Sequence, residues 1–324
     1  MNRVLLLFPD TPEAVIEYLS RAARVIGPVT PQDDWQTPLR DCDAAIIVVQ
    51  PQFTGAVMDS APKLRVIGRP GIGVDNVDLA ATTARGICVV NTPDAPTEPV
   101  AEKVIGWMLM LAHNLREADR VARVAEWQGR SALLGNDLEG KTLGLIGVGR
   151  VGSRVAQICS SAFGMRVLAS DPHTNAERAR QFGIELVASL DTLLPVADFL
   201  SVNCPLTAET HGMIGAKQLR AMKPTAFLIN SARAQVVDEA ALIQALREHW
   251  IAGAALDVFP TEPPPPDHPL LQMDNVILAP HMSSFTREGM LRMLMQTAEQ
   301  VMMVFNGQRP PNLVNAAVWE RRKT

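Results

Sequence analysis

The 324-residue sequence has little that indicates a secreted, membrane or nucleic-acid-binding protein. Its four cysteines, Cys42, Cys88, Cys159 and Cys204, form no CxxC pair, which argues against a disulfide framework and favours free thiols in a reducing compartment. The formal net charge of −4 provides no basic surface for nucleic acid or anionic lipid. No apolar run approaches the roughly 20 residues that a membrane span requires. We therefore expect a cytoplasmic protein with no metal site, no nucleic-acid partner and no membrane segment.

What the chain does contain is a regular alternation of short apolar runs and helix-like segments, the pattern of parallel sheets covered by helices. The first group of runs, at residues 4–8, 44–49, 64–68 and 87–90, predicts a smaller sheet. The second group starts at residue 142, ends near His281 and predicts six strands. A long helix is expected between the groups, at about residues 99–126, and a second, methionine-rich one at about residues 285–305.

These elements predict an α/β fold with two doubly wound parallel-sheet domains. We expect residues 1–100 and 287–324 to form a discontinuous, smaller, flavodoxin-like domain that binds substrate. A Rossmann domain at residues 101–286 is expected to be inserted into it. In open α/β sheets ligands bind beside the carboxyl ends of the strands, so we expect the site in a cleft at those ends.

Residues 142–171, TLGLIGVGRVGSRVAQICSSAFGMRVLASD, carry the most informative motif. An apolar strand leads into Gly147, Gly149 and Gly152, which allow a tight turn, close approach of a pyrophosphate and close helix–strand packing. Asp171 ends the next strand, where a carboxylate accepts hydrogen bonds from ribose hydroxyls and repels the 2′-phosphate of NADP. The sequence therefore predicts an NAD site, with NAD favoured over NADP.

Arg233, Glu262 and His281 each stand just after an apolar strand of the second group. Parallel strands place their carboxyl ends on one edge of a sheet, so these side chains are expected to converge. Reduction of a 2-oxo acid by NADH needs a proton at the carbonyl oxygen and a fixed cation for the carboxylate. Histidine suits the proton transfer, a carboxylate partner orients it, and arginine grips a carboxylate with two parallel hydrogen bonds.

Further characteristic segments are VIGRPGIGVDNVDL, NTPDAPTEPVAE, VNCPLTAETHGMI, GAALDVF and NVILAPH. With these segments, nearly the whole chain resembles the D-isomer-specific 2-hydroxyacid dehydrogenases. The resemblance implies that Arg233 orients the substrate, that Glu262 is the partner of the histidine, and that His281 is the proton donor. It also implies cofactor contacts and substrate contacts. The cofactor residues are Gly147, Gly149, Arg150, Val151, Gly152, Asp171, Cys204, Ala232, Arg233, Asp257, His281 and Ser283, and the substrate residues are Arg69, Ile72, Gly73, Arg233 and His281.

Three positions depart from the family pattern: Ala234 stands where glycine is common, Pro99 replaces a serine or threonine, and Phe285 lies where small residues are usual. None of these changes removes a catalytic group. We expect an NAD-dependent oxidoreductase that interconverts a small 2-oxo acid and its D-2-hydroxy acid, similar to glyoxylate/hydroxypyruvate reductase. The resemblance also implies a homodimer. Glu262 argues against the formate-oxidising branch, which has glutamine there. Phosphoglycerate dehydrogenase activity and a non-enzymatic, NAD(H)-sensing corepressor-like protein are the alternatives.

Overall fold

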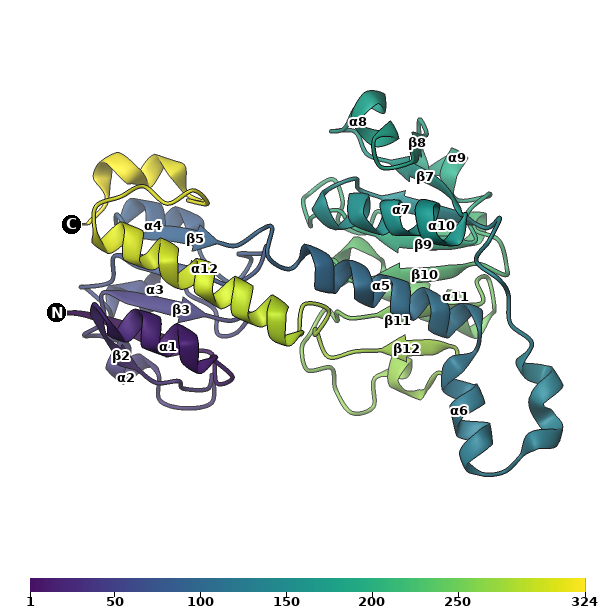
Figure 1. Cartoon of the computed structure of the whole chain (residues 1–324), viewed down its shortest axis with the longest axis horizontal. Coiled ribbons are helices and arrows are strands. Elements are labelled where there is room, and N and C mark those ends of the chain that lie inside the picture. Colours follow the sequence, from purple (N-terminus) through teal and green to yellow (C-terminus); the bar gives the residue numbers. More distant parts are fainter. Residues whose placement is uncertain (324) are drawn as a thin grey trace. The chain divides into compact units, whose positions relative to one another are not determined.

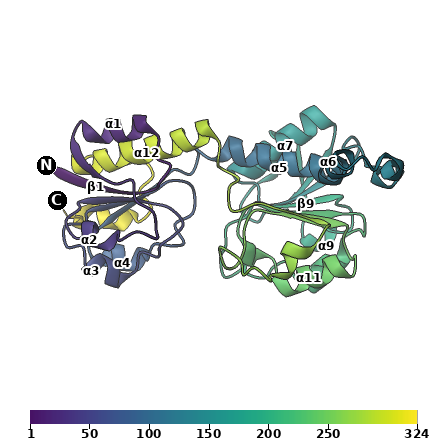
Figure 2. The ribbon, with the colours of Figure 1, turned by 90° about the horizontal axis from the view of Figure 1, so that it is seen from below.

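The computed structural model describes residues 1–323, and the chain folds into two compact units (Figure 1). Unit 1 comprises Met1–Pro96 and the segment from Ser284 onward, and unit 2 comprises Thr97–Ser283. Each unit is built on one parallel sheet with helices on both faces (Figure 2). The expected α/β fold with two parallel sheets is confirmed.

Unit 1 has a five-stranded sheet in the order β2-β1-β3-β4-β5. Its strands are β1 (Asn2–Leu7), β2 (Ala23–Ile26), β3 (Ala44–Ile47), β4 (Val66–Arg69) and β5 (Cys88–Asn91). One face is covered by α1 (Glu13–Ser20) and α12 (Arg287–Phe305), and the other by α2 (Gln36–Leu39), α3 (Gly55–Asp59) and α4 (Leu79–Ala84) (Figure 2). Successive β1 residues enter opposite cores, Val4 beneath α12 and Leu5 beneath the short helices, as the two-residue period of a strand requires.

Unit 2 has a seven-stranded sheet in the order β12-β11-β10-β9-β6-β7-β8. Its strands are β6 (Thr142–Ile146), β7 (Arg166–Ser170), β8 (Ile184–Leu186), β9 (Phe199–Val202), β10 (Phe227–Asn230), β11 (Gly253–Leu256) and β12 (Val276–Leu278). The helices α5 (Thr97–Ala112) and α7 (Arg150–Phe163) cover one face. The other face carries α9 (Leu190–Leu193), α10 (Ala216–Ala221) and α11 (Glu239–Arg247), while α8 (Ala176–Arg180) packs beside β8.

Both strand counts expected from the sequence were one too low. The missing strands are β2 in unit 1 and β8 in unit 2. Each is a short outer strand with an exposed charged residue in it, Arg24 in β2 and Glu185 in β8. A charge in so short a segment breaks the apolar run that marks the buried strands, so neither was recognised.

The single long helix expected at about residues 99–126 was also wrong. The structure has α5, then a break at Asn114 with a left-handed φ of 52°, then α6 (Leu115–Arg123). No residue of α6 is buried, nor any of the following 3-10 segment η1 (Trp127–Leu133). Figure 1 shows these two segments extending from the body of unit 2 as an arm. The apolar spacing that holds α5 against the sheet ends with Ala112, so nothing keeps the chain on the core beyond it.

Within residues 1–323, no helix combines the length and the apolar character that a bilayer crossing needs. The four cysteines are all free; Cys42, Cys88 and Cys159 are buried and Cys204 is half-buried. Burial raises the pKa of the Cys159 thiol to about 12, so this group stays a neutral thiol at physiological pH.

Candidate active site

All strands of the unit 2 sheet are parallel, so their carboxyl ends lie on one edge. The direction of winding reverses between β9 and β6, which is the topological switch point where open α/β sheets bind ligands. Residues that the sequence singled out follow the strands along this edge in the order His281, Asp257, Arg233, Cys204, Gly147 and Asp171. Residues more than a hundred positions apart in the chain therefore share one edge.

The glycine-rich turn between β6 and α7 has the shape of a phosphate-binding loop. Gly147 has a φ of 93°, and a Cβ there would lie 2.9 Å from the carbonyl oxygen of Asn203. A Cβ on Gly152 would overlap the carbonyl oxygen of Gly147, whereas the space beside Gly149 is open. Helix α7 starts at Arg150 without a side-chain cap, so its first N–H groups and the positive end of its dipole are directed to the loop. This arrangement fits a pyrophosphate.

Asp171, just after β7, is tied to that loop. Its carboxylate accepts hydrogen bonds from the backbone N–H of Val148, at 2.6 Å, and of His173, at 2.7 Å. The carboxylate is held at the end of β7, where a dinucleotide fold places the adenosine ribose. The glycine loop and Asp171 thus fit an NAD molecule, which supplies a hydride acceptor or donor when bound.

We predict that Asp171→Ala relaxes the preference for NADH over NADPH. Removing the negative charge removes its repulsion of a 2′-phosphate, and we expect the ratio of the two kcat/KM values to fall about tenfold, or ~1.4 kcal/mol. KM for NADH should rise as well, because Val148 loses its acceptor. The measurement is steady-state kinetics with both cofactors, with Asp191→Ala, an exposed aspartate on α9, as the matched control. An unchanged ratio would refute the ribose assignment.

His281 and Glu262 form a close pair. The Nδ1 atom of His281 lies 2.7 Å from Oε2 of Glu262, and Oε1 of Glu262 accepts a hydrogen bond of 3.0 Å from the Phe259 backbone N–H. Burial acts to raise the pKa of Glu262, but the hydrogen bond and charge of His281, with Phe259 and the charge of Arg233, outweigh it and lower that pKa. An ionised Glu262 holds a proton on Nδ1, which leaves Nε2 of His281 for proton exchange.

We predict that this pair makes stability depend on pH. A carboxyl whose pKa is lowered on folding stabilises the protein above its unfolded pKa of about 4.3, and the contribution disappears as pH falls through the folded value. Glu262→Gln should therefore be less stable than the wild type at pH 7, by on the order of 1 kcal/mol, and equally stable well below pH 4. Thermal unfolding across this range measures it, with the exposed Glu139→Gln as the control. A difference that persists at low pH would contradict this origin.

The turn that carries His281 is fixed by Asp257. His281 has a left-handed φ of 51° and donates its backbone N–H to the Asp257 carbonyl at 2.8 Å. The Asp257 carboxylate accepts from the backbone N–H of Met282, at 2.8 Å, and from both the N–H and the hydroxyl of Ser283, at 2.9 and 2.5 Å. Burial raises the pKa of Asp257 although these hydrogen bonds oppose it. Asp257, expected at the cofactor, thus also fixes the backbone around His281.

Arg233 follows β10 in a turn that is organised by a residue the sequence analysis missed. The buried Asn230 accepts a hydrogen bond from the Ala232 N–H and donates one to the Arg233 carbonyl, both at 3.0 Å. The sequence did contain a signal for this role of Asn230, because asparagine at the end of a strand commonly stabilises a turn through its side chain. The positive charge of Arg233 contributes to the lowered pKa of Glu262, so Arg233 lies within electrostatic reach of the pair that Glu262 forms with His281.

The expected substrate residues of unit 1 lie at the carboxyl end of β4. Arg69 is buried, and its guanidinium donates to the Asn76 side chain at 3.3 Å and to the Pro70 carbonyl. Ile72 is exposed, Gly73 is half-buried, and the preceding Gly71 donates its N–H to the Thr92 hydroxyl at 2.7 Å. The side chains of Arg69 and Thr92 thus hold the loop that presents Ile72 and Gly73.

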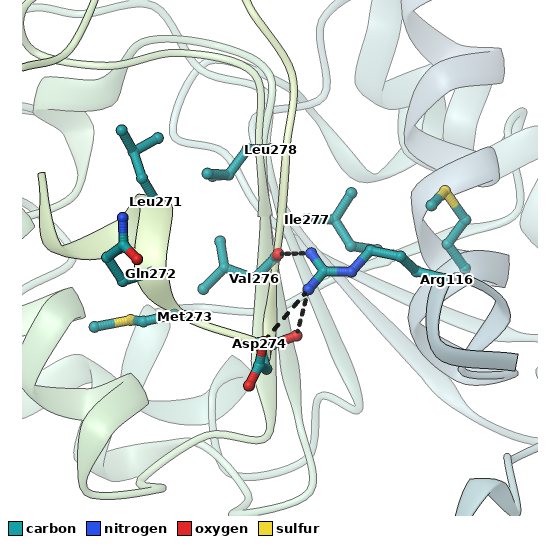
Figure 3. Close-up of a pocket in the computed structure, with 9 residues that line it drawn as sticks. Arg116, Leu271, Gln272, Met273, Asp274, Val276, Ile277 and Leu278 are labelled. Atoms are coloured by element: carbon teal, nitrogen blue, oxygen red, sulfur yellow. Dashed lines mark hydrogen bonds and ion pairs between the residues drawn. The ribbon is translucent and has the colours of Figure 1, made fainter. Parts of the chain in front are cut away.

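A hollow of about 400 Å³ lies elsewhere, at the amino end of β12 (Figure 3). Arg116 of α6 reaches into it and donates to the carbonyl oxygens of Val276, at 2.8 Å, and Asp274, at 3.3 Å. His281 follows the opposite end of the same strand. This hollow is therefore separate from the candidate active site.

Comparisons with known proteins agree with this geometry. A family model described as D-isomer specific 2-hydroxyacid dehydrogenase, NAD binding domain, matches residues 105–283. The chain belongs to the D-isomer-specific 2-hydroxyacid dehydrogenases. As a member of this family, it is an NAD-dependent oxidoreductase.

Relatives within the family carry several names. A glyoxylate reductase of Korarchaeum cryptofilum is 44% identical over 86% of this chain and 85% of its own length. A D-3-phosphoglycerate dehydrogenase of Archaeoglobus fulgidus is 44% identical over 84% of this chain, which spans only 51% of that relative. The solved D-lactate dehydrogenase of Aquifex aeolicus, complexed with NAD and lactic acid, is 29% identical with a TM-score of 0.85, covering 97% of this chain and 99% of its own.

Proposed function

We propose that this dehydrogenase reduces small 2-oxo acids to D-2-hydroxy acids with NADH, and that glyoxylate or hydroxypyruvate is its substrate. The observation that carries the proposal is the 2.7 Å contact between His281 and Glu262, close to Arg233 on the edge that bears the glycine-rich loop. The similarity to a glyoxylate reductase over most of both chains supports the choice of substrate.

In the proposed reaction His281, Glu262 and Arg233 have different tasks. The hydride that C2 of the oxo acid takes up would come from bound NADH. Nε2 of the protonated His281 gives its proton to the carbonyl oxygen, and Glu262 stabilises the imidazolium until then. The Arg233 guanidinium holds the substrate carboxylate and polarises the carbonyl. The products are the hydroxy acid, NAD and a neutral histidine, so the proton and the electron pair balance.

The remaining assignments complete the proposal. The cofactor is held by Gly147, Gly149, Arg150, Val151, Gly152, Asp171, Cys204, Ala232, Arg233, Asp257, His281 and Ser283. The hydrogen bonds that hold the loop around Ile72 and Gly73 support its assignment, with Arg69, to the substrate carboxylate. In this proposal NAD binds to unit 2, and Arg69, Ile72 and Gly73 of unit 1 serve the substrate.

The proposal extends to assembly and location. No residue of the arm formed by α6 and η1 is buried. In this arm Trp127 is 64% exposed, and the adjoining Leu134 is 86% exposed. An arm of this kind is what a second copy would cover, so we propose a homodimer. The four free thiols support a reducing, cytoplasmic location. Sedimentation equilibrium tests the dimer, and a monomer at micromolar concentration would refute it.

The test of the function is oxidation of NADH by purified protein with glyoxylate, hydroxypyruvate, pyruvate, phenylpyruvate, 2-oxoglutarate and phosphohydroxypyruvate. We expect turnover with the first two at the highest kcat/KM. A preference for phosphohydroxypyruvate would instead support phosphoglycerate dehydrogenase activity, which the 44% identity to such an enzyme makes the second candidate. Binding of NADH without turnover of any acid would point to a nucleotide sensor.

A further inference from the structure

The loop that carries Glu262 has few hydrogen bonds of its own. It runs from the end of β11 to the 3-10 turn η3 (Pro269–Gln272) and contains four consecutive prolines, Pro263 to Pro266. Proline has no N–H to donate, so this stretch has few means of fixing its position. Beyond Asp257, its backbone hydrogen bonds include that of the Phe259 N–H to the Glu262 carboxylate and that of the His268 N–H to the Pro265 carbonyl, at 3.0 Å each.

His268, at the far end of the loop, is held by side-chain contacts. Its Nε2 lies 2.7 Å from Oε1 of Glu239, and only 11% of the His268 side chain and 27% of the Glu239 side chain are exposed. Its Nδ1 accepts a hydrogen bond of 3.4 Å from the Leu270 N–H, so the ring hydrogen of Nε2 is directed to Glu239. The His268 ring also meets the buried Phe259 edge-on, with ring centres 5.7 Å apart.

The contact joins the two chain segments that carry the proposed catalytic residues. Glu239, the first residue of α11, lies six positions after Arg233, and His268 lies six positions after Glu262. A void of only about 20 Å³, lined in part by Ala234, Glu239 and Phe259, separates the two segments. A space of that size holds about one water, so the segments have little freedom to shift against each other while the contact is made.

Phe259 connects this contact to the site. The Phe259 ring packs on His268, and the Phe259 N–H donates to Oε1 of Glu262. The other carboxylate oxygen of Glu262, Oε2, pairs with Nδ1 of His281. We propose that His268 and Glu239 are positioning residues that hold Glu262 in register with His281. Neither residue is among those assigned to the cofactor or the substrate, and the proposal rests on the proposed roles of Glu262 and His281 in the reduction.

The kinetic test is His268→Ala in the full-length protein. A misplacement of about 1 Å costs up to about 10²-fold in rate, and we expect kcat for reduction of the 2-oxo acid to fall at least tenfold. The dissociation constant of NADH should change less than about twofold, because the glycine loop and Asp171 are untouched. His268→Gln, whose amide can still donate to Glu239, should recover most of the lost rate. His113→Ala, at an exposed histidine after α5, is the matched control.

Glu239→Ala removes the same contact from the other residue. It provides a second test of the proposal in case His268→Ala fails to fold. If the two residues act as a pair, the double variant should be no slower than the slower single variant. Independent, multiplicative losses would overturn the pairing. A loss of thermal stability with kcat unchanged in His268→Ala would mean that the contact serves the fold alone, and would overturn the proposal.

A second readout does not depend on turnover. The Nδ1 proton of His281, hydrogen-bonded to Glu262, should give a downfield proton NMR signal in the wild type, in His113→Ala and in His268→Gln. We expect that signal to broaden or vanish in His268→Ala. Its persistence there would refute the positioning role. If the wild type reduced no 2-oxo acid, the proposed function would fail while this signal still decided whether His268 positions Glu262.

Discussion

Replacement of His281 by glutamine is expected to lower kcat for reduction of the 2-oxo acid by about 10³-fold while leaving NADH affinity nearly unchanged. Glutamine has a similar reach and can still hydrogen-bond to Glu262, but it has no proton to give at neutral pH. The loss should therefore fall on the chemical step. Stopped-flow measurement of NADH binding, together with steady-state turnover, separates the two effects.

His249→Gln is a demanding control for this prediction. His249 is exposed, and it has a left-handed φ of 54°, close to the 51° of His281. Any penalty from placing glutamine in that backbone conformation should appear in both variants. Full activity in His249→Gln would confine the effect to the chemistry of His281. Loss of NADH binding in His281→Gln would show that the main task of this residue is to hold the cofactor, and would contradict its role as the acid.

Replacement of Arg233 by lysine is expected to lower kcat/KM for the 2-oxo acid by about 10²–10³-fold although the charge is kept. Lysine is a compact point charge and cannot supply two parallel hydrogen bonds to a carboxylate. Asn230 holds the backbone of residue 233 through its carbonyl. The Arg233 side chain adds a hydrogen bond of 2.8 Å to the Ala232 carbonyl, which a lysine ammonium can also make, so the fold should survive. Much of the loss should appear as a raised KM for the acid, since its carboxylate loses its anchor.

The control here is Arg247→Lys, an exposed arginine in the last turn of α11. Kinetics over a wide range of 2-oxo acid concentration distinguish KM from kcat, and fluorescence titration reports NADH binding. An unchanged KM for the acid in Arg233→Lys would mean that another cation binds the substrate carboxylate.

The sequence predicted the buried strands and the shared edge of the residues that follow them, because both follow from apolar runs and from the geometry of parallel strands. The positions of Arg233, Glu262 and His281 after their strands are the clearest case. The sequence analysis did not predict β8, where a charged residue interrupts the apolar run. It also missed the break at Asn114, where a single residue with a left-handed backbone ends the helix. Long-range contacts such as His268 with Glu239 depend on loop paths that no local pattern encodes.

Arg116 has a consequence for how the protein behaves in a concentrated solution. Among the described strands, β12 pairs with β11 on one side only, and an outer strand with open carbonyls invites another chain to add to the sheet. The Arg116 guanidinium donates a hydrogen bond to the carbonyl of Val276 at the start of β12, which places a positive charge against the backbone of this strand. For another polypeptide to pair with β12, it would have to replace Arg116 at the Val276 carbonyl and remove water from the charged guanidinium. Arg116 thus makes this border of the sheet a poorer template for the addition of another strand.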